Sequence, residues 1–338
     1  MSNLASIKSP TSRLIAVTGA SGFVGSHLVT ALRARGTQVR VIARSVEYDP
    51  PPGVESAVAA LDDPHALGAA VDGAYAVVHL AGRAHVMREA SPEHSAREFQ
   101  RHNVDTTRAV CDAARRARVT RVVYLSSLGA VTTTSASVVT DWTTAHPDSL
   151  YGRSKLAAEA VVRALAGSDG PEHVILRPPM IFGEGMKGNP LRLYRAVARG
   201  VPMPLGRIQN RRSLMYVGNL VSAIVTAVEM RGAIRDTFVI GDSQPLSSGD
   251  LVREIAASLG ARARVVPVPV WSLRAAGRVG DIMARVLPIP LTSDAVSRLT
   301  GSLAVDFTRF CRETGYMPLI AHQHALAVTA EWFKRLSA

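Results

Sequence analysis

The chain has 338 residues, a length that predicts about two domains and allows a large buried core. Hydrophobic residues make up 47% and charged residues 20%, which excludes a wholly disordered protein. The only two cysteines, Cys111 and Cys311, can build neither a disulfide framework nor a cysteine-based zinc site. The ten histidines show no metal-binding spacing, so no metal is expected.

The formal charge is +12, and 35 of the 39 basic residues are arginine. These arginines are scattered, which argues against a nucleic-acid partner and leaves either a compositional bias or attraction of anionic substrates such as nucleotides. The polar N-terminus lacks the apolar core of a signal peptide, and no uncharged apolar run approaches the roughly 18 residues of a membrane span. A cytoplasmic protein without an integral membrane segment is therefore predicted.

Short apolar runs alternate with helical patterns along the first half of the chain. Strands are predicted at 14–18, 38–43, 74–80, 121–125 and 173–176, and helices at 22–34, 103–116 and 151–165. This alternation is typical of an α/β fold, a doubly wound parallel sheet (Rossmann fold) with helices on both faces.

The frequency of glycine and proline rises after Arg177, which indicates a change of domain. We expect a cofactor domain over residues 1–180 and a smaller, mainly substrate-binding domain over residues 181–338. An apolar run within 236–243 predicts a return to the main sheet. The substrate domain at the C-terminus is therefore expected to be interleaved with the first domain.

The first predicted strand ends in a glycine-rich turn in which Gly19, Gly22 and Gly25 are spaced three apart. Gly19 would permit the sharp turn, Gly22 would let backbone N–H groups approach a pyrophosphate, and Gly25 would let the helix pack against the sheet. A strand before the turn and a helix after it predict a dinucleotide site. After the second strand, Arg44 stands where NAD-selective sites carry an acid, which favours a 2′-phosphate and hence NADP(H) over NAD(H).

Tyr151 and Lys155 begin the helix predicted after residues 147–149 and share one face of it. A nearby ammonium favours the phenolate form of tyrosine, which suits acid–base catalysis. The strand at 121–125 ends in Ser126 and Ser127, at the sheet edge where doubly wound folds bind ligands. Ser127 is the expected hydrogen-bonding partner of the reacting oxygen.

Four motifs together resemble the extended short-chain dehydrogenase/reductases: TGASGFVG, HLAG at 79–82, Ser126-Ser127, and YGRSK at 151–155. Within that family the chain resembles the nucleotide-sugar epimerases, dehydratases and reductases. More locally, AGRAHVMRE at 81–89 and NRRSLMYVGNLVSAI at 210–224 are similar to bacterial UDP-N-acetylhexosamine C4 enzymes of polysaccharide synthesis.

The resemblance assigns roles to single positions. Ser127, Tyr151 and Lys155 would be catalytic, with Ser126 as the alternative serine. Residues carried over to the cofactor are Gly19, Ser21, Gly22, Phe23, Val24, Gly25, Arg44, Leu61, Leu80, Ala81, Gly82, Asn103, Tyr151 and Lys155. Residues carried over to the substrate are Arg83, Ser127, Asn189, Arg212 and Arg298, and Arg177-Pro178 would lead toward the substrate. Arg212 would clamp the nucleotide diphosphate.

Four departures from the family pattern limit these roles. Ala60-Leu61 replaces the Asp-Leu that touches adenine, and Gly218 replaces an aspartate. No Asp-Glu pair follows Ser127, which argues against a dehydratase. The segment TTTSAS at 132–137 replaces the usual aromatic–glycine turn.

Residues 271–286 form an amphipathic pattern with a mainly basic stripe, carried by Arg274, Arg278 and Arg285. The pattern is consistent with a helix docked on the substrate domain, or with peripheral contact to an anionic membrane.

The resemblance implies an NAD(P)-dependent enzyme acting at C4 of a UDP-linked (N-acetyl)hexose, with a homodimer as the usual state of the group. The absent acid and Arg44 favour a 4-keto-sugar reductase of the UDP-N-acetylquinovosamine type. A UDP-glucose or UDP-N-acetylglucosamine 4-epimerase with tightly bound NAD is the alternative. A non-catalytic NADP-sensing protein is the third hypothesis.

Overall fold

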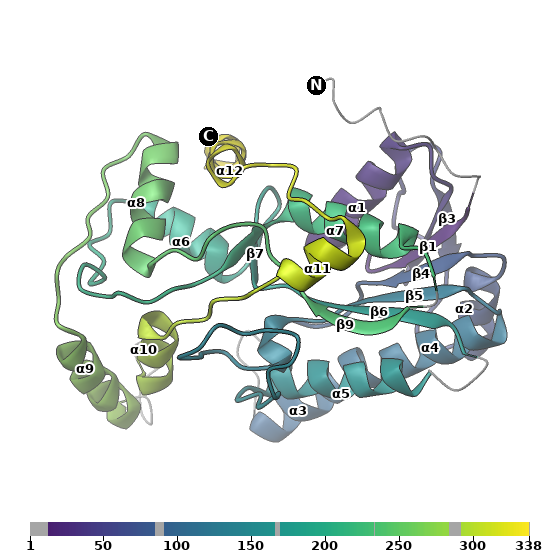
Figure 1. Ribbon diagram of the computed structural model, residues 1–338, viewed down its shortest axis with the longest axis horizontal. Helices are drawn as coiled ribbons and strands as arrows, with labels where there is room; N and C mark the ends of the chain where they lie inside the picture. The colour runs from purple at the N-terminus through teal and green to yellow at the C-terminus, as the bar shows by residue number, and fades with distance from the viewer. Residues whose placement is uncertain (1–12, 85–90, 166–169, 233, 284–291, 338) are drawn as a thin grey trace.

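The computed structural model describes residues 13–84, 91–165, 170–232, 234–283 and 292–337. Its centre is a seven-stranded sheet in which every neighbouring pair is parallel, in the order β3-β2-β1-β4-β5-β6-β9 (Figure 1). The strands are β1 (Ile15–Thr18), β2 (Val39–Ala43), β3 (Glu55–Val58), β4 (Ala76–His79), β5 (Arg121–Leu125), β6 (Glu172–Arg177) and β9 (Arg235–Val239).

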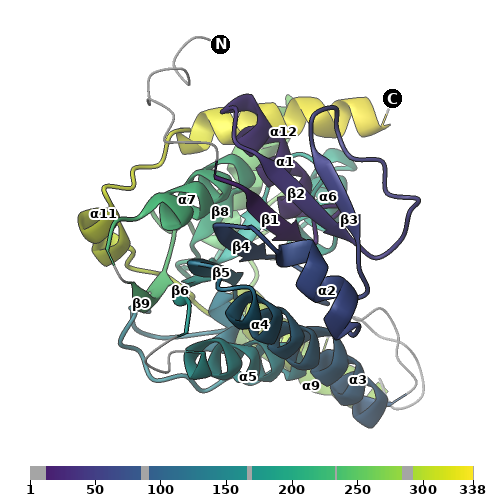
Figure 2. The ribbon, with the colours of Figure 1, turned by 90° about the vertical axis from the view of Figure 1, so that its right-hand side faces the viewer.

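Helices cover both faces of this sheet (Figure 2). One face carries α1 (Phe23–Ala34) and α7 (Val217–Glu229), and the other carries α2 (Pro64–Val71), α4 (Thr106–Arg116) and α5 (Leu150–Ala164). The predicted doubly wound α/β fold is confirmed. β9 lies at the edge of the sheet beside β6, although 57 residues separate the two strands in the chain.

The alternation of side chains along the strands explains the two-sided core. Ile15 and Val17 of β1 face the α1/α7 side, whereas Ala16 between them faces the α2/α4/α5 side. Both sides are fully buried, so the strands contain continuous apolar runs in place of a polar–apolar alternation.

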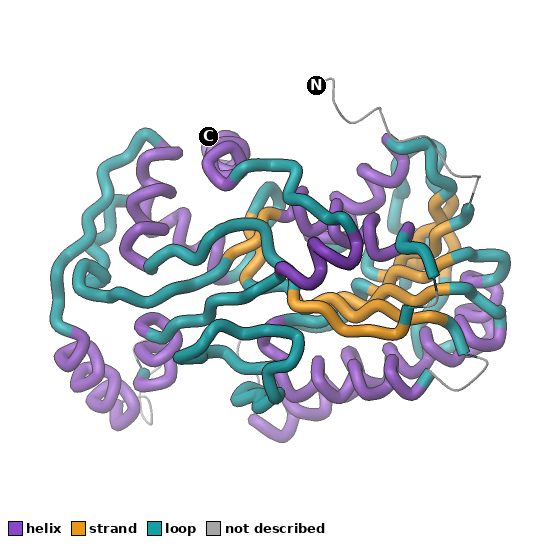
Figure 3. The backbone as a smooth tube through the Cα atoms, viewed as in Figure 1, coloured by secondary structure: helices purple, strands orange, loops and turns teal. Residues whose placement is uncertain are grey.

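The carboxyl side of the sheet continues into a second region made mostly of helices and loops (Figure 3). It contains the two-stranded sheet of β7 (Met180–Phe182) and β8 (Leu214–Tyr216). Its helices are α6 (Asn189–Ala198), α8 (Ser248–Leu259), α9 (Val270–Met283), α10 (Ser293–Thr300) and α12 (His322–Ser337). A short helix, α11 (Thr308–Thr314), packs against β9 and links the two regions.

Three further elements shape the functional edge. Helix α3 (Pro92–Phe99) runs directly into the π-helical turn η1 (Gln100–Asp105), which leads into α4, and the 3₁₀ turn η2 (Leu128–Ala130) follows β5. None of the helices in the described ranges combines the length and apolar character that crossing a bilayer requires.

Candidate active site at the carboxyl edge of the sheet

The glycine turn between β1 and α1 has no room for side chains. Gly19 has φ +72°, and a Cβ there would lie 2.7 Å from the backbone nitrogen of Ala81. A Cβ on Gly25 would overlap the carbonyl oxygen of Gly19. The two glycines therefore allow α1 to begin directly against the ends of β1 and β4.

The turn forms one wall of a cleft of about 980 Å³. Eight residues predicted to bind the cofactor line it: Gly19, Ser21, Gly22, Arg44, Leu61, Leu80, Ala81 and Gly82. Arg83, predicted for the substrate, lines it as well. Phe23, Val24 and Gly25 do not line the cleft; they form the first turn of α1, which has no side-chain cap and no acidic residue. The exposed N–H groups of that turn suit an anion such as a pyrophosphate.

The far end of the cleft, near β2, carries charges of both signs. Arg44 is exposed there, as predicted from its place after the strand. Glu47, Asp62 and Arg101 also line this end, and Arg101 lies 3.7 Å from Asp62. None of these three was singled out from the sequence, because exposed charged residues in loops carry no periodic pattern.

Ser127 and Tyr151 meet at the ends of β5 and α5. The Ser127 hydroxyl accepts a hydrogen bond from the Gly129 amide at 3.1 Å. A Cβ on Gly129 would lie 3.3 Å from this hydroxyl and 3.7 Å from the Tyr151 ring, so the two side chains lie on the same side of Gly129. Gly152 makes this approach possible, since a Cβ there would overlap the Gly129 carbonyl. Burial raises the pKa of Tyr151, and the nearby Ser127 hydroxyl offsets part of the rise.

Lys155 lies one turn further along α5 and is buried. Its Nζ donates a hydrogen bond of 2.7 Å to the Leu125 carbonyl and lies 4.3 Å from the centre of the Tyr124 ring. Burial lowers the pKa of this ammonium to about 7, and the Glu159 carboxylate acts in the opposite direction. Lys155 does not line the large cleft itself; it lies directly behind Gly82, 4.0 Å from where a Cβ of that glycine would be.

Ser126, the alternative catalytic serine, is turned away from Tyr151. Its hydroxyl donates to the buried Glu159 carboxylate at 2.6 Å. Arg177 binds both oxygens of the same carboxylate, at 2.9 and 2.6 Å, and Arg163 adds a second cation. Burial alone would raise the pKa of Glu159, but Arg177 and the other partners lower it below its usual range. Arg177 thus pairs with Glu159 rather than facing the substrate side.

Asn103 joins the cleft to α5. Its side-chain oxygen accepts from the Arg83 amide at 2.7 Å, and its nitrogen donates to the Arg83 carbonyl and to the Ser154 hydroxyl. The irregular turn η1 directs this side chain inward, toward α5. Asn103 therefore fixes the backbone beside Gly82 relative to the helix that carries Tyr151 and Lys155.

On the substrate side, Arg212 is largely buried. Its Nη1 donates to the carbonyls of Arg298 at 2.8 Å and Gly301 at 3.0 Å, and burial lowers its pKa. A Cβ on Gly301 would overlap the methyl group of Thr134, in the segment that follows Ser127. The 132–137 segment therefore packs against residues 301–302, next to a carbonyl that Arg212 binds. The Ser135 amide also donates a hydrogen bond to the Ser302 carbonyl.

Not all predicted substrate residues come together. Arg298 presents its backbone carbonyl to Arg212, whereas its guanidinium pairs with Asp294. Asn189 is an exposed residue at the start of α6.

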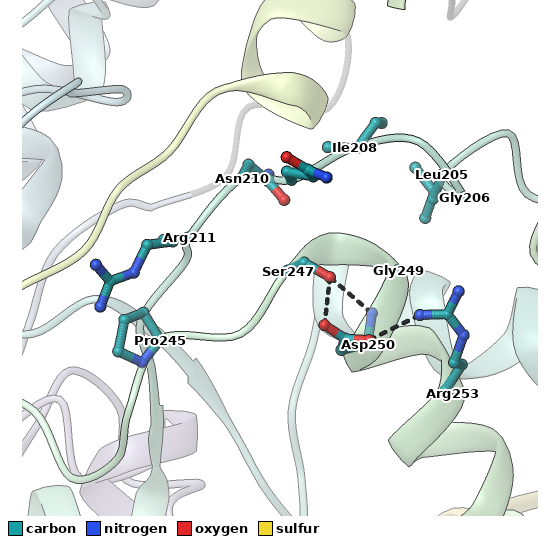
Figure 4. A pocket seen from close by; sticks show the side chains of 11 residues that line it. Leu205, Gly206, Ile208, Asn210, Arg211, Pro245, Ser247, Gly249, Asp250 and Arg253 are labelled. Carbon is teal, nitrogen blue, oxygen red and sulfur yellow. Dashed lines mark hydrogen bonds and ion pairs between the residues drawn. The ribbon is translucent and has the colours of Figure 1, made fainter. Parts of the chain in front are cut away.

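A smaller cleft of about 410 Å³ adjoins Arg212 in the chain (Figure 4). Asn210 and Arg211 line one side of it, and Ser247, Asp250 and Arg253 at the start of α8 line the other. Asp250 accepts hydrogen bonds from both Ser247 and Arg253, at 2.7 Å each. This cleft was not predicted, because its two walls lie about 40 residues apart in the chain and carry no shared motif.

The parallel sheet, the tight glycine turn and the tyrosine–lysine helix at the sheet's carboxyl edge together define an extended short-chain dehydrogenase/reductase. The chain belongs to the NAD dependent epimerase/dehydratase family, whose model matches residues 15–241. It is 33% identical over 325 residues to a UDP-glucose 4-epimerase of Vibrio cholerae, an alignment that covers 94% of this chain and 95% of the relative.

Two further similarities extend over nearly the whole chain. A 3 beta-hydroxysteroid dehydrogenase/Delta 5-->4-isomerase of Mycobacterium tuberculosis is 31% identical, with 95% of this chain and 90% of the relative covered. The structure of MoeE5 in complex with UDP-glucose and NAD superposes with a TM-score of 0.75 at 26% identity, covering 96% of this chain and 99% of that one.

Proposed function

We propose that this protein transfers a hydride between a nicotinamide cofactor and C4 of a UDP-linked hexose. The observation that carries the proposal is the closeness of Ser127 and Tyr151 beside Gly129 at the end of β5, with buried Lys155 next to Gly82 of the glycine-lined cleft. The similarity to a UDP-glucose 4-epimerase and to a UDP-glucose complex supports the substrate class.

The large cleft fits a nicotinamide dinucleotide. The uncapped start of α1 offers backbone N–H groups to a pyrophosphate, and the missing side chains at Gly19 and Gly22 leave it room. When bound, the cofactor supplies or accepts the hydride. The NAD in the MoeE5 complex supports NAD(H), whereas Arg44 beside the cleft supports NADP(H).

Tyr151 is assigned the proton transfer. Because its pKa is raised, the phenol is protonated at neutral pH and can give its proton to the oxygen at C4 as a ketone is reduced. Ser127 holds that oxygen through its hydroxyl. In the oxidative direction Tyr151 takes the proton back. Buried Lys155 has a pKa near neutrality, so its charge responds readily to what binds beside it.

Arg212 and the smaller cleft are assigned to the nucleotide end of the substrate. The two carbonyl bonds of Arg212 use Nη1 only, and no carboxylate contacts its guanidinium among the described residues. The remaining donors suit the oxygens of a diphosphate. The packing of Gly301 on Thr134 brings this guanidinium toward the loop that begins at Ser127.

The direction favoured is net reduction of a 4-keto sugar, since Arg44 suits a reductase that takes up NAD(P)H. Epimerisation at C4 is the second candidate, favoured by the 33% identity to the Vibrio cholerae enzyme. It would use the same three side chains twice, first to oxidise C4 and then to reduce its other face.

Cofactor content and substrate turnover of the purified protein test the proposal. A reductase oxidises added NADH or NADPH only when a UDP-4-keto sugar is present. An epimerase interconverts UDP-glucose and UDP-galactose, or their N-acetyl forms, with cofactor that survives purification. Turnover of a 3β-hydroxysteroid with no turnover of any UDP-sugar would overturn the proposal and assign the site to lipophilic alcohols.

A further inference from the structure

Helix α9 turns an apolar face toward solvent. Trp271, Val279 and Ile282 are 73%, 55% and 65% exposed, and Ala275 and Met283 are exposed as well. At about 100° per residue these five side chains fall within one arc of roughly 120°. Elsewhere in the described residues, exposed apolar side chains as large as these are isolated or in loops, as are Trp142 and Met317. A single helix face thus concentrates apolar surface that the fold leaves uncovered.

The opposite face of α9 provides all of its packing. Leu273, Gly277 and Gly280 are buried, and a Cβ on Gly277 would lie 3.1 Å from the backbone of Ser293 at the start of α10. The glycines let the two helices approach closely. The inner face of α9 therefore packs against the rest of the protein, and its outer apolar face is left exposed by the described residues.

Two arginines border the apolar face. Arg274 and Arg278 are exposed, and neither takes part in an ion pair within the described residues. The helix has one acid, Asp281, whose carboxylate accepts a hydrogen bond of 2.9 Å from the Ser293 amide. The Arg298 guanidinium on the neighbouring α10 is paired with Asp294. The free charge along the outer side of α9 is thus positive.

We propose that the outer face of α9 docks on an anionic phospholipid bilayer. Trp271, Val279 and Ile282 would enter the boundary between headgroups and acyl chains, while Arg274 and Arg278 bind lipid phosphates. A second copy of this chain fits the face less well, because a two-fold contact would bring the unpaired arginines of both copies together in a protein of net charge +12.

This docking would orient the molecule. α9 and α10 lie at the end of the protein far from β1–β3 (Figure 1). α10 supplies the Arg298 carbonyl that binds Arg212, so the bilayer would lie against the substrate side and leave the glycine turn toward the aqueous side.

Vesicle co-sedimentation of the full-length protein tests the proposal. Wild type is expected to sediment with phosphatidylcholine vesicles containing about 30 mol% phosphatidylglycerol, but not with phosphatidylcholine alone. Release by about 0.5 M NaCl is expected for the electrostatic part. The variants Arg274→Glu/Arg278→Glu and Trp271→Ser/Ile282→Ser should each weaken binding by about tenfold or more.

Matched substitutions on other surfaces are the controls. Arg195→Glu/Arg199→Glu removes the same charge from exposed positions on and just after α6, and Met317→Ser/Leu319→Ser removes two exposed apolar side chains from a loop. Both should bind vesicles like wild type. Equal loss in these controls, or unchanged binding in the α9 variants, overturns the proposal. A dimer that dissociates on Trp271→Ser/Ile282→Ser substitution, seen by sedimentation velocity without lipid, also overturns it and assigns the face to a second copy.

Discussion

The glycine turn and the surroundings of Arg212 are the two places proposed to bind phosphate groups, and they use different parts of the chain. At the turn, the missing side chains of Gly19 and Gly22 leave room in the cleft, and the uncapped start of α1 follows directly after them. At Arg212 a long side chain crosses the interior and is held by two backbone carbonyls. The glycine turn depends on missing side chains, whereas the second site depends on one side chain, Arg212, that is held in place.

Opposite kinds of substitution should therefore impair binding at the two surfaces. Adding a methyl group damages the turn, because nothing near Gly19 or Gly25 can move aside. Removing atoms damages the Arg212 site, because the hydrogen bonds of this guanidinium are lost with it. Tyr151 belongs to neither surface, so its loss should affect the reaction without affecting either one.

Replacement of Tyr151 by Phe should have the largest effect. Turnover of the UDP-sugar is expected to fall by about 10²- to 10⁴-fold, because the proton donor is lost. The dissociation constants of cofactor and UDP should stay within about twofold, as measured by fluorescence titration. Tyr75→Phe is the control, since this ring stacks under Arg13 at the opposite edge of the sheet. Turnover retained in Tyr151→Phe would assign the proton transfer to another group.

Gly25→Ala should reveal the rigidity of the turn. Overlap of the new methyl group with the Gly19 carbonyl is expected to lower the free energy of unfolding by about 1–3 kcal/mol and to abolish cofactor binding. Gly68→Ala in α2 is the matched control, because open space surrounds it and alanine should add about 0.5–1 kcal/mol of stability. Thermal unfolding with and without cofactor measures both, and a Gly25→Ala protein as stable as wild type would contradict the packing described.

Arg212→Ala should weaken binding of the UDP-sugar. The KM for the UDP-sugar is expected to rise by about 10- to 100-fold, since hydrogen bonds to a charged phosphate are lost, while cofactor affinity stays unchanged. Arg211→Ala, at the exposed neighbouring position, is expected to change KM less. A larger effect of Arg211→Ala, or a loss of cofactor affinity in Arg212→Ala, would remove Arg212 from the substrate side.

Lys155 should make the stability of the cofactor-free protein depend on pH. Its pKa falls from 10.5 to about 7 on folding, so between these values the unfolded chain binds more protons and this group makes stability rise with pH. Lys155→Met removes that dependence. The melting temperature of the variant minus that of wild type should be highest near about pH 6 and should decrease toward about pH 9.5. A difference that does not change with pH would show that Lys155 is solvated.

Arg44→Ala should have the smallest effect. If Arg44 binds a 2′-phosphate, affinity for NADPH should fall by about tenfold and affinity for NADH should change little. Equal changes for both cofactors would mean that the mixed charges around Glu47 and Asp62 decide the preference.

Most of the sheet could be predicted because its strands are buried on both faces. β1, β4 and β5 are built around buried apolar runs, whereas β3 (ESAV) is largely exposed and was not predicted. β7 and β8 are three residues long, too short for a periodic pattern.

In the candidate site, too, local features could be predicted and contacts between distant elements could not. The spacing of Tyr151 and Lys155 on one helix is local and was visible in the sequence. The choice of Ser127 over Ser126 depends on Glu159 and Arg177, which come from two other elements and meet only in the fold. The burial of Arg212 against carbonyls of residues 298 and 301 is equally non-local.

The central claim, hydride transfer at C4 beside Tyr151, is tested most directly with deuterium. The protein, supplied with nicotinamide cofactor carrying deuterium at its reactive C4 and with a UDP-4-keto hexose, should form UDP-hexose that carries deuterium at C4 of the sugar. The Tyr151→Phe variant should form almost none. Product without deuterium at that carbon, or equal labelling by the variant, would contradict the account.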